Sequence, residues 1–272
     1  MPSFEHRGHR LAYTERGSGP RTVVLLHGLL LSQKMHVPLS RALAARGNRV
    51  VTLDLLGHGQ SDRPADMTQY SMVEFGRQVV ALLDHLDVEE AVLLGTSLGA
   101  NTALEAAVAA PERCRGLVVE MPVLDNALLG CALAFTPLMA GLTFGEPLAR
   151  LVGAVARAIP SRDLFFLDVG LDTVRQDPRP SAAVLQGLFF GRVAPPKAER
   201  RTIQVPTLVI GHRRDPVHPF SDAGALHEEL PDARLLEADS ILELRLAPER
   251  LTDEIAAFVD ERWRPVRRRR AA

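Results

Sequence analysis

The sequence predicts an α/β fold with a mostly parallel sheet flanked by helices and interrupted by a helical insertion. Short apolar runs alternate with helical stretches over the first 121 residues and again after Arg201. This order favours a parallel sheet that is covered on both faces. Between these parts, residues 122–200 are rich in Leu, Ala, Phe and Pro and contain no good strand pattern. We therefore expect a core built from 1–121 and 201–272, and a helical lid, called the cap below, built from 122–200.

The first part of the core shows the alternation clearly. Two short segments of alternating polarity open the chain and end at a Gly-Ser-Gly-Pro turn. Apolar runs that stop at turn signals then predict buried strands, and the stretches between them have helical spacing. Ser71 is followed by Glu74 three residues later, which indicates a capping box at a helix start. The predicted strands are 22–26, 50–54, 91–94 and 117–119, and the predicted helices are 39–46, 71–86 and 100–110.

The alternation resumes after the insertion. It predicts strands at 205–210 and 233–236 and helices at 221–230 and 248–263. The last helix runs into six arginines between Arg262 and Arg270. We interpret this end as a solvated tail, with contact to an anionic partner as the alternative.

Composition excludes several classes of function. The 272 residues carry 32 basic and 33 acidic side chains, a net charge of −1, which argues against a nucleic-acid-binding protein. Two cysteines are too few for a disulfide scaffold, so a reduced, cytoplasmic setting is the default expectation. The N-terminus shows no signal-peptide pattern.

No segment of the sequence has the pattern of a membrane span or a cofactor site. The longest apolar stretch, 124–142, is interrupted by Asp125 and by helix-disfavoured Gly and Pro residues, so a cap helix is favoured over a span. No His, Cys or Asp cluster has metal-ligand spacing, and no phosphate-binding glycine loop is present. We expect no metal and no cofactor. The oligomeric state is not predicted.

The strongest motif is Gly95-Thr-Ser97-Leu-Gly99, which follows a predicted strand and precedes a predicted helix. This is the context of a nucleophile elbow, in which small flanking residues permit a tight turn and the serine hydroxyl is exposed. The helix that begins at Leu98 also directs backbone N–H groups to the same point. Ser97 is therefore the predicted nucleophile.

At these residues the chain resembles the α/β-hydrolase family over nearly its whole length. His27-Gly28 is similar to the family's His-Gly turn, and the resemblance implies that the N–H groups of Leu29 and Leu98 form an oxyanion hole. Residues 54–61 resemble the family's structural Asp-x-x-Gly-x-Gly-x-Ser loop. The resemblance further implies that Asp215, after the strand 205–210, is the acid of a Ser…Asp…His triad and that the insertion is the lid.

The sequence departs from the family pattern at the base. The resemblance places the histidine near Ser240 or Ile241, but no histidine occurs after His227. A serine hydroxyl needs a positioned base to attack a carbonyl group. The missing histidine is therefore the most informative departure.

Three side chains are candidates for a replacement base or for groups that line the pocket. His218 lies three residues after Asp215, and one intervening strand would put it roughly 10 Å from the strand of Ser97, within reach of a loop side chain. His36 occupies a position that often lines the pocket in the family. Glu120 ends a strand at an alternative acid position. Asp215 either orients the base or is a structural carboxylate.

These observations leave three hypotheses. The first is a serine hydrolase of carboxylic esters, thioesters or lactones with an apolar acyl or aromatic group, which uses Ser97, Asp215 and a non-standard base, His218 or His36. The second is a catalytically impaired protein of this fold that binds a small apolar ligand. The third is a cofactor-free lyase or isomerase with His36 or Glu120 as proton donor. Six of the ten phenylalanines lie in the cap, consistent with an apolar pocket.

Overall fold

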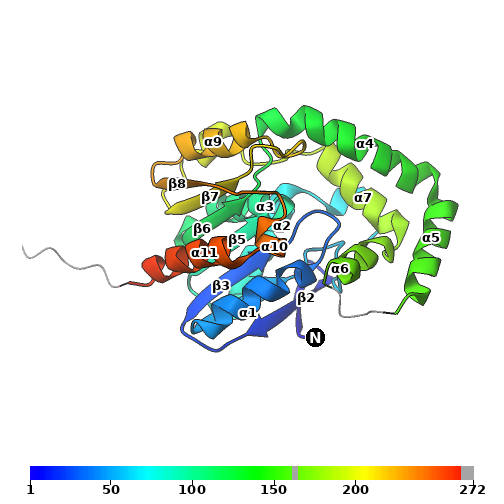
Figure 1. Cartoon of the computed structure of the whole chain (residues 1–272). Coiled ribbons are helices and arrows are strands. Elements are labelled where there is room, and N and C mark those ends of the chain that lie inside the picture. The colour runs from blue at the N-terminus through cyan, green and yellow to red at the C-terminus, as the bar shows by residue number, and fades with distance from the viewer. Residues whose placement is uncertain (161–164, 265–272) are drawn as a thin grey trace, which may run out of the picture.

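The computed structural model describes residues 1–160 and 165–264, so the arginine-rich end from residue 265 onward lies outside the described residues. Its centre is an eight-stranded sheet in the order β1-β2-β4-β3-β5-β6-β7-β8 (Figure 1). The first two strands are antiparallel to their neighbours and all the others are parallel. The strands are β1 (Ser3–His6), β2 (His9–Arg16), β3 (Arg21–Leu26), β4 (Asn48–Leu53), β5 (Ala91–Thr96), β6 (Cys114–Glu120), β7 (Thr207–Gly211) and β8 (Ala233–Glu237).

Helices cover both faces of the sheet, which confirms the predicted α/β fold. One face packs on α1 (Val37–Ala45) and α11 (Glu249–Arg262) through a cluster that includes Leu43 and Phe258. The other face packs on three helices through a larger cluster that includes Phe75. These three helices are α2 (Met72–His85), α3 (Leu98–Ala109) and α9 (Phe220–Glu229). The central strands are buried on both sides, as their continuous apolar runs predict.

Strand register brings the ends of β5, β6 and β7 together. Thr96 pairs with Glu120, and Glu120 pairs with Ile210. Because parallel strands end at the same edge of the sheet, the loops that follow these three strands are neighbours. One strand, β6, separates the strands that precede Ser97 and Asp215.

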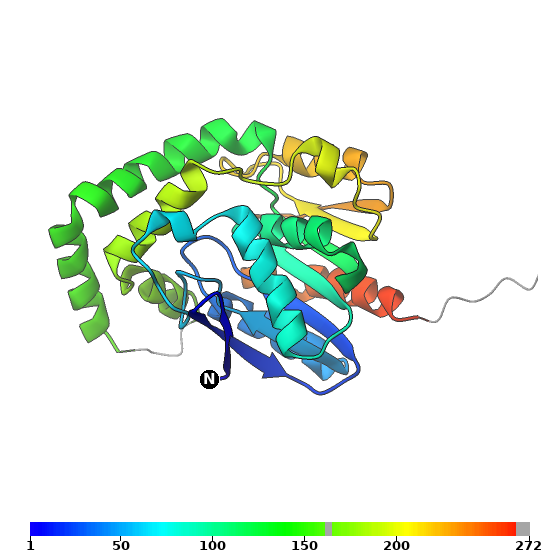
Figure 2. The ribbon, with the colours of Figure 1, turned by 180° about the vertical axis from the view of Figure 1, so that it is seen from behind.

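The interval between β6 and β7 contains helices and turns wherever the structure describes it. Figures 1 and 2 show that α4 and α5 run along the outer edge of the molecule, with α7 between them and the sheet. The cap helices are α4 (Leu128–Phe144), α5 (Glu146–Ala158), α6 (Phe165–Val174), α7 (Pro178–Phe189) and α8 (Lys197–Arg200). Shorter helices are η1 (Gln33–His36), η2 (Met67–Gln69), η3 (Pro111–Arg113), η4 (Asp125–Ala127) and α10 (Glu243–Leu246).

Buried polar side chains attach both ends of the cap to the core. The Asn101 amide of α3 donates to the carbonyl oxygens of Val123 and Val193, at 2.7 and 2.6 Å. These residues lie at the beginning and the end of the cap. The buried carboxylate of Asp222 accepts backbone N–H groups from the η4 region, at Leu124, Asn126 and Ala127. These contacts fix where the cap leaves and rejoins the sheet.

The predicted capping box at α2 is only half formed. The Ser71 hydroxyl accepts the Glu74 N–H at 3.2 Å, which is the expected helix cap. The Glu74 carboxylate instead bonds to His6 at 2.7 Å and Arg7 at 2.8 Å. His6 ends β1 and Arg7 follows it, and the Arg7 guanidinium is a stronger donor to a carboxylate than a backbone N–H.

Candidate active site

Ser97 sits on a strained turn between β5 and α3. Its backbone has φ 54° and ψ −112°, a conformation that residues with a side chain rarely adopt. A Cβ on Gly95 would lie 2.0 Å from the Gly99 carbonyl oxygen, and a Cβ on Gly99 would lie 2.1 Å from the Leu26 carbonyl oxygen. The glycine spacing of the motif is therefore a steric requirement of this turn.

The loop after β7 brings a histidine and a carboxylate to this serine. His218 Nε2 lies 2.8 Å from Ser97 Oγ, and His218 Nδ1 lies 2.8 Å from Asp215 Oδ2. A carboxylate next to Nδ1 favours the tautomer with its proton on Nδ1, so that Nε2 accepts the serine O–H. The structure thus assembles Ser97, His218 and Asp215 in one hydrogen-bonded line.

Asp215 is held in place by its own loop. Its Oδ1 accepts the backbone N–H groups of Val217 at 2.8 Å and His218 at 2.9 Å, while Oδ2 faces the imidazole. Burial by itself would raise the pKa of Asp215, but the hydrogen bonds and charge of His218 and the Val217 N–H outweigh it and lower the pKa below its ordinary value. Asp215 is therefore a carboxylate at neutral pH and orients the ring of His218.

The family resemblance implies an oxyanion hole formed by the N–H groups of Leu29 and Leu98, and both residues lie beside Ser97. Leu98 is the first residue of α3, where helices leave N–H groups without an intrahelical partner. Within the described residues, the Leu29 N–H makes no hydrogen bond. Both residues line the same cavity as Ser97. The helix N-terminus adds a partial positive charge at this point.

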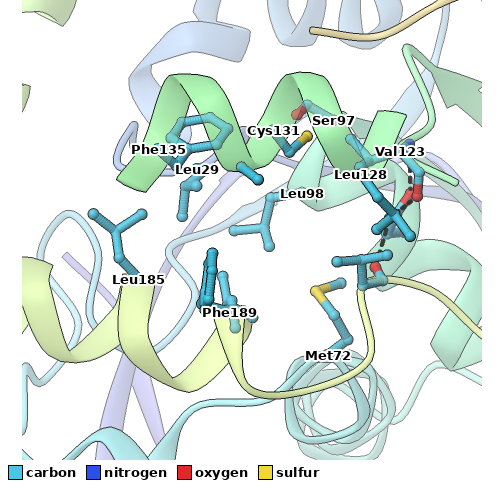
Figure 3. A pocket seen from close by; sticks show the side chains of 14 residues that line it. Leu29, Met72, Ser97, Leu98, Val123, Leu128, Cys131, Phe135, Leu185 and Phe189 are labelled. Atoms are coloured by element: carbon cyan, nitrogen blue, oxygen red, sulfur yellow. Dashed lines mark hydrogen bonds between the residues drawn. The ribbon is translucent and has the colours of Figure 1, made fainter. Parts of the chain in front are cut away.

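The cavity beside Ser97 has a volume of about 280 Å³ and lies between the core and the cap (Figure 3). Apolar side chains of α4 and α7 form its cap side. The polar side chains in its wall are Ser97, Asn101 and Cys131, and the Asn101 amide is already bonded to Val123 and Val193. The cap residues in the wall are Val123, Leu128, Cys131, Ala132, Phe135, Leu185, Leu188, Phe189 and Val193. Such a wall suits an uncharged apolar group.

His36 does not line this cavity, and the prediction of a pocket position for it is wrong. Its ring is buried, and Nε2 donates to the carbonyl oxygen of Leu26 at 2.9 Å. Burial lowers the pKa of His36 to about 3, with a smaller contribution from the nearby Arg245 charge. His36 is a neutral structural group at the end of β3.

Glu120 is also outside the cavity, which corrects its assignment as a pocket residue. It forms a buried ion pair with Arg245 of α10, with Oε1 at 2.5 Å from Nη1 and Oε2 at 2.8 Å from Nη2. The Thr96 hydroxyl donates to the same carboxylate. Although burial alone would raise the pKa of Glu120, the Arg245 charge and these hydrogen bonds lower it. The pair fixes the end of β6 beneath the elbow, where the Ser97 N–H also donates to the Glu120 carbonyl at 2.9 Å.

No sequence pattern distinguishes Arg245, Asn101 or Asp222. Arg245 is one arginine in an arginine-rich chain, and its partner lies 125 positions earlier. Asn101 and Asp222 hold the cap through backbone groups, which leave no residue pattern. Within residues 1–160 and 165–264, no group of three or more His, Cys, Asp or Glu side chains is arranged to hold a metal ion.

Comparison with known proteins agrees with this fold. A family model described as alpha/beta hydrolase fold matches residues 21–240. The putative non-heme haloperoxidase of Mycobacterium phage D29 is 29% identical over 270 residues, which cover 92% of this chain and 91% of that protein. The 2-hydroxymuconate semialdehyde hydrolase of Pseudomonas putida is 28% identical over 207 residues, with 71% and 69% covered.

Solved structures show the same fold. The crystal structure of the enol-lactonase from Burkholderia xenovorans LB400 superposes with a TM-score of 0.76. It is 21% identical and covers 95% of this chain and 100% of its own. At this identity the similarity shows the fold alone.

Proposed function

The chain belongs to the α/β-hydrolase fold family, and from this premise we propose that it is a serine hydrolase of carboxylic esters, thioesters or lactones with an apolar acyl or aromatic group. The single observation that carries the proposal is the Ser97 Oγ–His218 Nε2–Nδ1–Asp215 line, with 2.8 Å at both contacts. Named relatives that include hydrolases support hydrolase activity in general.

The proposed reaction has two steps. His218 Nε2 takes the Ser97 proton while Oγ attacks the substrate carbonyl carbon, and the N–H groups of Leu29 and Leu98 stabilise the negative oxygen. The C–O or C–S bond to the leaving group then breaks, and His218 returns the proton to that group. Water repeats the sequence on the acyl-serine, releases the acid and restores Ser97. Asp215 remains ionised and stabilises the imidazolium.

The apolar cavity supports an apolar acyl or aromatic group as the part of the substrate that is bound. Its wall offers no charged side chain among the described residues, so a carboxylate or ammonium group would be buried without a partner. The binder hypothesis depended on the absence of a base, and a histidine at hydrogen-bond distance from Ser97 removes that ground. The lyase hypothesis depended on His36 or Glu120, which both lie outside the cavity.

A fluorophosphonate probe tests the proposal directly, because it reacts with activated serines. We expect rapid labelling at Ser97, located by peptide mass, and no labelling of Ser97→Ala. Ser221→Ala is the matched control, since Ser221 is an exposed serine in the first turn of α9 at the same edge of the sheet. The unchanged protein and Ser221→Ala should also hydrolyse p-nitrophenyl esters, and Ser97→Ala should not. A folded protein that is not labelled, or an adduct that persists in Ser97→Ala, would contradict the proposal.

A further inference from the structure

The outer surface of the cap is unusually apolar. Helix α4 has no charged residue over its 17 positions. The helical stretch Asp125–Phe144 is long and apolar enough to cross a membrane by length and composition, yet only 6% of its most apolar window is buried. Soluble monomers rarely leave large apolar patches in water.

Helix α4 is apolar on both of its faces. Leu128, Cys131, Ala132 and Phe135 follow helical spacing on the inner face and line the cavity. Leu129 and Leu133 face outward and are exposed. One helix therefore separates the cavity from the surroundings, and both of its sides favour apolar contacts.

Helix α5 extends this surface. Leu148, Leu151, Val152 and Val155 form an apolar stripe that faces outward, while the buried positions are the small residues Gly153 and Ala156. Arg150 and Arg157 lie on the opposite side of the helix by spacing. A helix with an outward apolar stripe and an arginine-bearing polar face is the pattern of helices that lie in a membrane interface.

We define the outer cap face by six side chains that are 59 to 86% exposed: Leu129, Leu133, Phe144, Leu148, Leu151 and Val155. We propose that the outer cap face docks on a lipid surface and that the substrate is an uncharged, poorly water-soluble ester taken from that lipid. The inference rests on the proposed function for its substrate. The docking itself is independent of the chemistry.

The shape and polarity of this face favour lipid over a second protein chain. In Figures 1 and 2, α4 and α5 follow the outside of an arch, so the face is convex. Two copies of a convex face touch over little area, whereas fluid lipid adapts to it. Protein interfaces also contain about one hydrogen bond per 100–200 Å². The six large side chains that define the outer cap face are all hydrocarbon and need no such partner.

The contacts of α4 with the core indicate that it lies on the lipid and does not span it. The start of α4 packs on the loop that carries Asp215 and His218. A Cβ on Gly130 would be 2.8 Å from the Pro216 carbonyl oxygen, and Cys131 Sγ lies 3.9 Å from the Val217 carbonyl oxygen. Its inner face is a wall of the cavity. Insertion across a bilayer would remove that wall from Ser97.

Flotation with lipid vesicles tests the docking. The whole protein is mixed with phosphatidylcholine vesicles, with and without phosphatidylglycerol, at low and high salt. We expect binding to both vesicle types that persists at high salt, because apolar contact is not screened by ions. The variant Leu129→Gln/Leu133→Gln/Leu148→Gln/Leu151→Gln should bind at least about tenfold more weakly. The matched control is Leu246→Gln on α10, outside the cap, since Leu246 and Leu151 are both 61% exposed.

Activity on two substrates completes the test. The fourfold variant should hydrolyse a short soluble ester as the unchanged protein does, and should lose about tenfold or more on a long-chain ester presented in vesicles. Equal vesicle binding by the fourfold variant, or no binding by the unchanged protein, overturns the inference. The inference is also overturned if light scattering shows that the unchanged protein is a dimer, the fourfold variant is a monomer, and neither binds vesicles. Labelling of Ser97 without vesicle binding defeats only this inference, and vesicle binding without labelling defeats only the proposed function.

Discussion

The loops after β7 and β8 leave neighbouring strands at the same edge of the sheet but hold different kinds of side chains. The β7 loop carries Asp215 and His218 within four residues, with His218 in contact with Ser97 and Asp215 in contact with the His218 ring. The segment after β8 contains no histidine and instead sends Arg245 into a buried pair with Glu120. The family resemblance assigns the base to the second segment, and the structure has a histidine at hydrogen-bond distance in the first.

In the proposed mechanism, the base is identified by its geometry and not by its place in the chain. A histidine reaches Ser97 from the β7 loop because β7 lies only two strands from β5. The segment after β8 contains no histidine and contributes Arg245 to the ion pair with Glu120 beneath the elbow. We therefore expect changes after β7 to affect catalysis and changes after β8 to affect stability.

Replacement of His218 should have the largest effect. His218→Ala removes the proposed base for Ser97, so kcat/KM should fall by about 10⁴-fold or more, with a small change in stability. The control is His212→Gln on the same loop. His212 Nδ1 accepts the Arg214 N–H, and its replacement should change kcat/KM by less than about tenfold. Ester hydrolysis and thermal unfolding measure the two effects. If His212→Gln were as damaging as His218→Ala, the assignment of the base would be wrong.

Replacement of Arg245 should produce the opposite pattern. Arg245→Met leaves the Glu120 carboxylate buried without its cation, which should reduce the free energy of unfolding by about 3–5 kcal/mol. The protein that remains folded should keep its activity within about tenfold. The double variant Glu120→Met/Arg245→Met should be more stable than Arg245→Met, because no charge is left unpaired. Denaturant unfolding measures this order, and equal stability of the single variant and the unchanged protein would contradict it.

The pH dependence sharpens this second prediction. Arg245 holds the pKa of Glu120 below its ordinary value, so the pair contributes stability above the unfolded pKa of about 4.3. That contribution is lost as pH falls through the lower folded pKa. In Arg245→Met, burial raises the Glu120 pKa, and the carboxyl takes up a proton at higher pH. The stability deficit of the variant should therefore be larger at pH 7 than near pH 4.

Much of the sheet could be predicted because its strands are buried and therefore apolar throughout. Boundaries were less accurate: β6 was predicted at 117–119 but begins at Cys114, since Arg115 and Gly116 interrupt the apolar run. The elbow was visible because its sterics demand glycines at fixed positions. The sequence predicts His218 only as one of two candidate bases beside His36, because its contact with Ser97 depends on strand order and on the two N–H groups that hold Asp215 toward the ring.

The smallest effect should come from the backbone of Ser97 itself. Its φ of 54° strains any residue with a Cβ, and glycine relieves that strain. Neither Ser97→Gly nor Ser97→Ala retains the hydroxyl, but Ser97→Gly should be more stable by about 1 kcal/mol. Ser40 in helix α1 is the control, where glycine should be less stable than alanine by a similar amount. Chemical denaturation of the four variants gives both differences. If glycine were also the less stable choice at position 97, the elbow would hold no strain, and its geometry would have to be set by packing alone.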